Sequence, residues 1–183
     1  MAAAWTLDFN LTRNETMATS KSATHTGLPE GFESPLKRVA MEERCDDIIA
    51  SIATLSQKSL ADVHKMAAQL GVPAVGPYFI YESKIAAILI NLAGLVATSY
   101  KEFSSYGELG NASILLVDYD EITEMGRHVV FVRVPGQKGS PEWSYIIDVG
   151  NWIEPEYHYT TALNKYKPAY FINVTPRPQA KGK

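Results

Sequence analysis

Three residues of this chain could together perform nucleophilic chemistry: Cys45, His128 and Asp148. A cysteine attacks as a thiolate, an imidazole can accept the thiol proton, and a carboxylate beside the imidazole fixes its tautomer. Cys45 is the only cysteine in the sequence, which excludes an intrachain disulfide and a cysteine-rich zinc site. The set therefore indicates acyl transfer through a thiol, provided that the fold brings the three side chains together.

Cys45 stands where an amphipathic helix is predicted to begin. Apolar residues recur at helical spacing over residues 45–56, opposite Asp46, Asp47, Ser51 and Thr54. The positive end of a helix dipole favours a thiolate, and the backbone N–H of Cys45 could stabilise a developing oxyanion. For Cys45 alone, the competing interpretation is a buried and inert thiol.

His128 and Asp148 belong to one predicted β-hairpin, with strands over 128–134 and 143–149. If the hairpin is centred near Lys138, the two residues face each other across adjacent strands. A slip of one residue in the register would separate them. Taken singly, His128 could simply begin a strand, and Asp148 could accept backbone N–H groups in the following turn.

The elements that must position these residues are predicted as helices first and strands afterwards. The Ser59–Asp62 capping pattern and Gly71 bound a second helix, and a third is expected over about Glu82–Leu92. Short runs rich in β-branched and aromatic residues follow at 95–100, 113–119, 128–134, 143–149 and 169–174. This order predicts an α+β fold in which the helices, with Cys45 at the start of the first, pack on a largely antiparallel sheet.

The length of 183 residues predicts one domain with tails. We expect a flexible or draped arm over residues 1–34, the domain over 35–175, and a basic tail over 176–183. The 17 basic and 20 acidic residues create no overall basic field, so we expect neither nucleic acid nor an anionic membrane as partner. The most apolar stretch, Ile85–Ala97, is shorter than the ~20 residues of a membrane-spanning helix.

Several segments resemble a known family. They are the stretch beginning Cys-Asp-Asp-Ile-Ile-Ala at Cys45, the Lys-Ser-Leu-Ala-Asp-Val helix, Gly-Arg-His-Val-Val-Phe-Val around His128, and Tyr-Ile-Ile-Asp-Val ending at Val149. In order and spacing they are similar to the papain-like cysteine peptidase fold, and within it to bacteriocin-processing (double-glycine) peptidase domains of bacteria. The resemblance implies Cys45 as nucleophile, His128 as general base and Asp148 as its orienter. It also implies peptide or amide substrates and no metal or organic cofactor.

Two departures from the family pattern keep other functions open. The stretch Glu33–Arg44 has no Gln to complete an oxyanion hole. Asp46 and Asp47 directly follow Cys45, and their negative charges disfavour a thiolate there; the positive charge of Arg44 offsets them only in part. The alternative is a catalytically inactive papain-like domain that acts as a protein or peptide interaction module. A further alternative is an effector that deamidates a protein glutamine with the same residues.

Trp143 and Trp152 lie near Asp148 in the sequence and are predicted to bind the substrate in a cleft, although packing on a sheet face is the usual role of such residues. His158 is a second candidate base, and His64 is interpreted as a helix-surface residue.

The acidic group Asp118, Asp120, Glu121 and Glu124 lacks the spacing of a calcium loop, so we expect a solvated loop and no metal. Residues Met1–Asn10 have no Sec-type signal pattern, which favours a cytoplasmic protein or export by another route. The sequence leaves the oligomeric state open.

Overall fold

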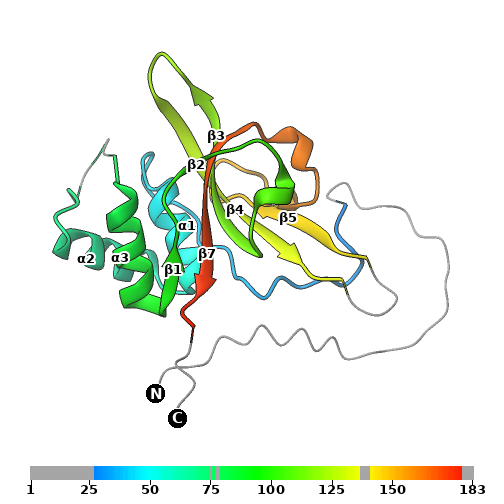
Figure 1. The fold of residues 1–183 in the computed structure, drawn as a ribbon, viewed down its shortest axis with the longest axis horizontal. Helices are drawn as coiled ribbons and strands as arrows, with labels where there is room; N and C mark the ends of the chain where they lie inside the picture. The colour runs from blue at the N-terminus through cyan, green and yellow to red at the C-terminus, as the bar shows by residue number, and fades with distance from the viewer. Residues whose placement is uncertain (1–26, 75, 77–78, 137–140, 179–183) are drawn as a thin grey trace, which may run out of the picture.

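A computed structural model describes residues 27–74, 76, 79–136 and 141–178 (Figure 1). The helices precede the strands, as the sequence predicts. The helices are α1 (Asp47–Ser56), α2 (Leu60–Gln69) and α3 (Glu82–Ala93), with short 3-10 turns at Tyr106–Glu108, Pro155–Tyr157 and Leu163–Lys165. The strands are β1 (Leu95–Ala97), β2 (Lys101–Glu102), β3 (Ala112–Asp120), β4 (Met125–Val134), β5 (Trp143–Ile147), β6 (Tyr159–Thr160) and β7 (Pro168–Pro176).

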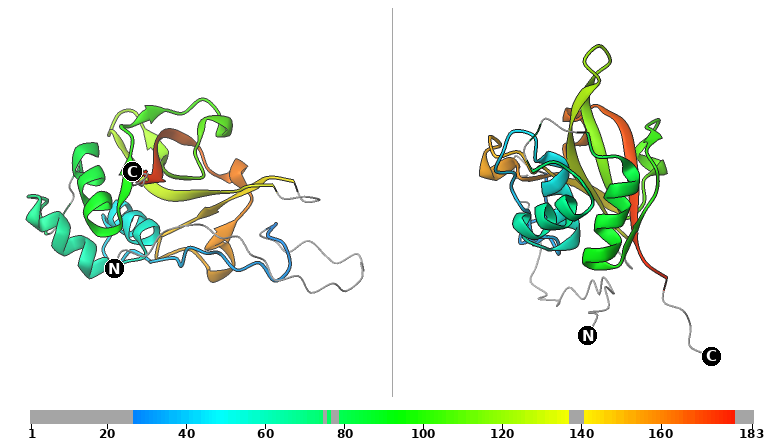
Figure 2. Two further views of the ribbon diagram at one scale, coloured as in Figure 1. Left: turned by 60° about the horizontal axis from the view of Figure 1, so that its bottom comes forward. Right: turned by 90° about the vertical axis from the view of Figure 1, so that its left-hand side faces the viewer.

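The seven strands of the described residues form one sheet in the order β1-β7-β3-β4-β5-β6, and β2 also pairs with β7. Every pairing is antiparallel, which confirms the predicted α+β architecture. The helices α1, α2 and α3 gather on one side of the sheet (Figure 2). The larger hydrophobic core lies between them and the sheet, and a smaller cluster around Phe131 and Phe171 covers the opposite face.

Helix α1 is more deeply buried than its sequence pattern predicts. It packs against α2, α3 and β4, so that Ser51 and Thr54, expected on a solvent face, are buried. The Thr54 hydroxyl accepts a hydrogen bond from the backbone N–H of Val39 at 3.0 Å, which satisfies its polar oxygen inside the core. The helix also begins later than expected, at Asp47, so Cys45 lies in the turn that precedes it.

The two other helices follow their sequence signals closely. Ser59 caps α2 by accepting a hydrogen bond from the Asp62 N–H at 3.1 Å. Gly94 ends α3 with a positive φ of 66°, a conformation that glycine adopts without a steric penalty. None of the helices in the described ranges is long and apolar enough to cross a membrane.

The register between β4 and β5 differs by one residue from the expected one. Val130 pairs with Ile147, so the same register sets Asp148 opposite Val129 and not opposite His128. Val130 and Ile147 belong to the core beneath the helices, whereas Val129 belongs to the cluster on the other face. Because side chains alternate along a strand, this shift sends Asp148 to the face opposite His128.

Residues on both sides of the expected domain boundaries contact the fold. Phe32, expected in the arm, packs edge-on against Trp143 and Tyr145, with ring centroids 4.8 and 5.3 Å away. Strand β7 reaches Pro176, and the N–H of Arg177 donates to the Gly94 carbonyl at 2.9 Å. Residues 1–26 of the expected arm and 179–183 of the expected tail lie outside the described residues.

Candidate functional site

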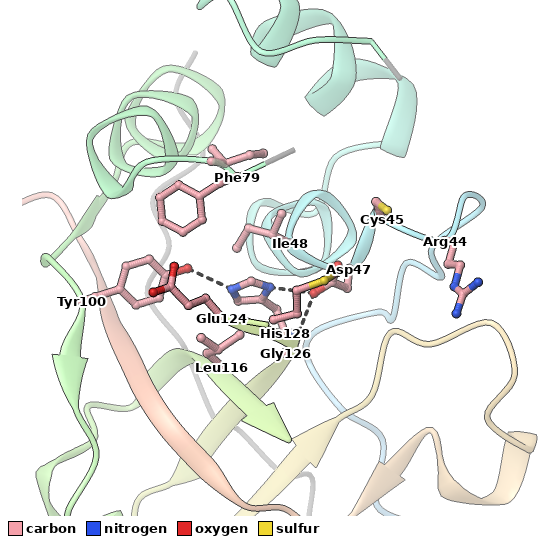
Figure 3. A pocket seen from close by; sticks show the side chains of 12 residues that line it. Arg44, Cys45, Asp47, Ile48, Phe79, Tyr100, Leu116, Glu124, Gly126 and His128 are labelled. Atoms are coloured by element: carbon pink, nitrogen blue, oxygen red, sulfur yellow. Dashed lines mark hydrogen bonds and ion pairs between the residues drawn. The ribbon is translucent and has the colours of Figure 1, made fainter. Parts of the chain in front are cut away.

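A pocket of about 310 Å³ lies where the start of α1 meets the start of β4 (Figure 3). Four segments build it: the turn before α1, the residues before α3, Tyr100 just before β2, and the β3–β4 hairpin. Its lining combines one thiol, one imidazole and two carboxylates with apolar side chains. The lining residues are Arg44, Cys45, Asp47, Ile48, Phe79, Ile80, Tyr100, Leu116, Glu124, Met125, Gly126 and His128.

Asp47, in the first turn of α1, holds His128 through a single carboxylate oxygen. This Oδ2 lies 2.6 Å from the backbone nitrogen of His128 and 2.6 Å from its Nδ1. Both side chains are largely buried, with exposed fractions of 16% and 14%. An ionised carboxylate can only accept hydrogen bonds, so Nδ1 carries a proton and donates it toward Asp47.

Tyr100 occupies the other ring nitrogen of His128, with its hydroxyl 2.9 Å from Nε2. Burial raises the pKa of the Tyr100 hydroxyl, and the charges of Asp47 and Glu82 raise it further. The hydroxyl therefore stays protonated and donates to Nε2 when the imidazole is neutral. The result is a chain of hydrogen bonds running from Tyr100 through His128 to Asp47.

Cys45 is half-buried and lines the same pocket, as its predicted role requires. In Figure 3 its side chain lies on the Asp47 side of the imidazole, and Tyr100 lies on the opposite side. Within the described residues, no hydrogen bond joins the Cys45 thiol to His128, whose Nδ1 is bound to Asp47. The structure thus brings thiol and imidazole into one pocket without direct contact.

The predicted contact between Asp148 and His128 is wrong. The Asp148 carboxylate is fully buried and accepts hydrogen bonds from Arg127 Nη1 at 2.7 Å, the Tyr166 hydroxyl at 3.1 Å and the Gly150 N–H at 3.0 Å. These bonds satisfy the carboxylate on the face of the sheet opposite His128. The one-residue register shift is the physical cause, and Asp47 makes the contact expected of Asp148.

Asp148 belongs instead to a cluster of buried charges at the end of β5. Burial alone would lower the pKa of Arg127, but Asp148 and Asp118 raise it, so this guanidinium remains charged. The Arg38 side chain donates to the carbonyls of Asp148 and Gly150 and so ties the segment before α1 to the same turn. This cluster supports the structure and is not part of the pocket.

The two tryptophans predicted to bind substrate lie outside the pocket lining. Trp143 packs against Phe32 and Tyr145, and Trp152 is 56% exposed. The imidazole of His158, the second candidate base, donates from Nε2 to the Ile153 carbonyl at 2.9 Å.

His64 lies on α2 as expected, and its Nε2 is 3.3 Å from a carboxylate oxygen of Asp46. In the predicted acidic loop, Asp120 accepts hydrogen bonds from the N–H groups of Ile122 and Thr123. Across the described ranges, no group of three His, Cys, Asp or Glu side chains is placed to hold a metal ion.

Sequence reasoning missed the two partners of His128. Asp47 is an acidic residue at the predicted helix start, which is a recognisable signal, but the sequence indicates only the effect of its charge on the helix terminus and on the thiolate. Tyr100 ends a predicted strand and carries no motif, so only the folded arrangement could find it.

No protein-family model matches the chain, and no curated protein matches it. Among solved structures, it is similar to a double glycine motif protease from an AMS/PCAT transporter, in a crystal structure of its complex with the leader peptide. The two chains are 17% identical, the match covers 77% of this chain and 91% of that chain, and the TM-score is 0.49. What the pocket can do has to be inferred from its own residues.

Proposed function

We propose that this chain is a cysteine hydrolase of the papain-like kind, which cleaves a peptide or amide bond with Cys45 as nucleophile and His128 as general base. The observation that supports the proposal is the shared pocket, which is lined by a thiol from the turn before α1 and an imidazole from β4. A nucleophile and a base in one cavity are the minimum set for acyl transfer through a thiol.

The reaction requires Nδ1 of His128, the ring nitrogen on the Cys45 side, to take the thiol proton. The thiolate then adds to the substrate carbonyl carbon, and the tetrahedral intermediate collapses as His128 returns the proton to the leaving amine. Water next attacks the thioester, with His128 accepting a water proton and returning it to the thiol. The products are a carboxylic acid, an amine and the free Cys45 thiol.

The start of α1 can stabilise the developing oxyanion. The first turn of a helix leaves N–H groups without intrahelical partners, and no side chain caps those of α1. These N–H groups, together with the positive end of the helix dipole, are the kind of donor that acyl transfer requires. They offer a substitute for the Gln that the stretch 33–44 lacks.

In the free protein, Asp47 competes with the thiol for Nδ1. Catalysis therefore requires that Asp47 release this nitrogen, for instance when a bound substrate approaches the start of α1. Catalytic hydrogen bonds are often misaligned in proteins without substrate and tighten only in the complex. The apolar residues Phe79 and Met125, 69% and 60% exposed beside the pocket, suit a peptide with an apolar side chain near the cleaved bond.

A non-catalytic peptide-binding module is the second candidate. The observation that favours it is the engagement of both ring nitrogens of His128, by Asp47 and Tyr100, in place of the thiol. Deamidation of a protein glutamine uses the same residues as the hydrolase and releases ammonia in place of an amine. It differs from peptide hydrolysis only in the substrate.

The pH dependence of Cys45 alkylation by iodoacetamide separates these functions. In Asp47→Ala, where Nδ1 is free to pair with the thiolate, we expect labelling to persist below pH ~7, where an ordinary thiol of pKa ~8.5 reacts slowly. In Asp47→Ala/His128→Ala the ordinary pH profile should return, because the base is gone. Asp62→Ala, which removes an exposed first-turn carboxylate from α2, is the matched control.

If the single and double variants label with the same pH profile, His128 does not activate the thiol and the binding module is the correct function. Cleavage itself is then sought by incubating the full chain and Cys45→Ala with a peptide library and analysing the products by mass spectrometry. New termini that appear with the wild type and not with Cys45→Ala support the hydrolase. Identical product patterns with both proteins contradict it.

A further inference from the structure

We infer that Tyr100 is the positioning residue of this site: its hydroxyl holds Nε2 of His128 and, once Asp47 releases Nδ1, keeps that nitrogen on the Cys45 side of the ring. The inference rests on the proposed hydrolase function. It gives Tyr100 the orienting role that the sequence suggested for Asp148. Two observations carry it, namely the 2.9 Å contact to Nε2 and the opposite placement of Tyr100 and Cys45 about the ring (Figure 3).

Tyr100 is anchored independently of α1. On one side the Thr98 N–H donates to the Asn173 carbonyl at 3.0 Å, and on the other the Phe103 N–H donates to the Ala169 carbonyl at 2.8 Å. These bonds and the pairing of β2 with β7 fix the backbone around Tyr100 to the sheet. A movement of Asp47 at the start of α1 therefore leaves the Tyr100 hydroxyl in place.

A hydroxyl suits both states of the imidazole, because it can donate or accept a hydrogen bond. While Asp47 holds the Nδ1 proton, Tyr100 donates to the lone pair of Nε2. When Asp47 withdraws, the imidazole can carry its proton on Nε2 and donate it to the Tyr100 oxygen. The lone pair of Nδ1 then faces the Cys45 side, as deprotonation of the thiol requires.

The surrounding charges keep Tyr100 in its neutral form. Asp47 and Glu82 act on its hydroxyl together with burial, and Glu124 lines the same pocket. Among the described lining residues, Arg44 is the only arginine or lysine, and it is exposed in the turn before α1. Tyr100 therefore serves as a neutral partner of the imidazole over the working pH range, and not as a second base.

Nitrogen NMR of the full chain labelled with ¹⁵N-histidine tests the inference without needing a substrate. His128→Gln assigns the resonances, and spectra are recorded at pH about 7.5, above the ordinary histidine pKa of about 6.5. In the wild type we expect the proton on Nδ1. In Asp47→Ala it should move to Nε2, and in Asp47→Ala/Tyr100→Phe the two tautomers should mix because neither nitrogen has its partner.

Tyr81→Phe is the control, since Tyr81 is exposed beside the pocket and its ring contacts Phe79. It should leave the His128 resonances unchanged. Adding Tyr100→Phe to Asp47→Ala should also lower the rate of Cys45 alkylation about two- to tenfold, the range of one net hydrogen bond.

A His128 tautomer that does not respond to Tyr100→Phe in the Asp47→Ala background overturns the inference, whatever the thiol does. If the His128 tautomer changes with Tyr100→Phe but the rate of Cys45 alkylation does not change when His128 is replaced, the contact is supported and the proposed function is overturned. The two failures are therefore distinguishable.

Discussion

At the residue scale, the decisive contact is that of Asp47, whose Oδ2 binds both the backbone and the ring of His128. This single carboxylate oxygen therefore links α1 to β4 and holds the imidazole of His128 in one orientation. Cys45 and His128 share a pocket, and within the described residues no hydrogen bond joins them. Residue types alone indicated the pair, because thiol and imidazole carry recognisable chemistry.

Residue types could not indicate the partner of His128. The sequence offers both Asp47 and Asp148 as carboxylate partners for His128. The β4–β5 register, which differs by one residue from the expected one, places Asp148 on the other face of the sheet and leaves the contact to Asp47. The loop joining β4 and β5 does not specify that register by any two-residue turn signal.

Asp148→Ala tests the structural role of Asp148. It leaves the half-buried guanidinium of Arg127 without its buried partner, so we expect a loss of about 3 kcal/mol in the free energy of unfolding, the low end of the range for a buried pair. Urea unfolding measures this loss. Asp118→Ala, which removes the more exposed partner of Arg127, should cost less than about 1 kcal/mol. If Asp148→Ala instead leaves stability intact and changes the His128 tautomer, the assignment to the buried cluster is wrong.

Cys45→Ala tests whether the thiol is held for chemistry or for packing. The side chain is half-buried in a turn outside α1, so its loss should change the melting temperature by about 2 °C or less. Any turnover found with the peptide library should disappear. A marked loss of stability, measured by differential scanning calorimetry, would show that Cys45 is a core residue.

At the scale of elements, the site depends on the part of β4 that extends beyond β5. The β4–β5 pairing ends at Val130, so the backbone N–H of His128 is free to donate to Asp47. The sequence predicts the order of helices and strands and the caps of α2 and α3, because periodicity and capping act locally. It did not predict the burial of Ser51 and Thr54, which depends on what packs around α1.

Gly126→Ala tests how tightly the β3–β4 hairpin positions His128. A Cβ at Gly126 would lie 2.9 Å from both Leu116 Cδ1 and the Val117 carbonyl oxygen. Overpacking of this kind costs about 1–3 kcal/mol, which urea unfolding would detect. The His128 resonances should shift as well, since β4 has to move. Gly107→Ala is the control, because a Cβ there would lie at an ordinary 3.6 Å from the Ser105 hydroxyl oxygen. It should leave the His128 resonances unchanged and alter stability only by the small difference in backbone preference between Gly and Ala.

At the scale of the whole molecule, the length predicts one domain, and the order of helical and extended segments predicts its α+β class. They could not predict that Phe32 packs on Trp143 and Tyr145, since an isolated aromatic residue in a polar segment has no periodicity to place it. The same core contains the Tyr145 hydroxyl, hydrogen-bonded to Ser34 at 2.8 Å.

This burial predicts how the fold responds to alkali. Burial raises the pKa of Tyr145 to about 12, whereas an unfolded tyrosine ionises near 10. The folded chain then keeps a proton that the unfolded chain has lost, so the contribution of Tyr145 to stability is constant below pH about 10 and falls as the pH rises toward 12. The slope should be about 1.4 kcal/mol per pH unit for this group, measured by urea unfolding.

Tyr145→Phe should reduce this alkaline slope by the share of Tyr145, although it lowers stability at neutral pH by removing the bond to Ser34. Tyr81→Phe, at an exposed position, should leave the slope as in the wild type. Equal slopes in all three proteins would contradict the prediction.

The lone half-buried thiol in the pocket wall also makes the protein its own sensor. A trifluoromethyl reagent can reach no sulfhydryl group other than Cys45, so a fluorine label enters the cavity without any engineering. The fluorine signal would respond to whatever occupies the space between α1 and β4. Fragments of candidate peptides could then be ranked by direct titration, even for a chain that turns none of them over.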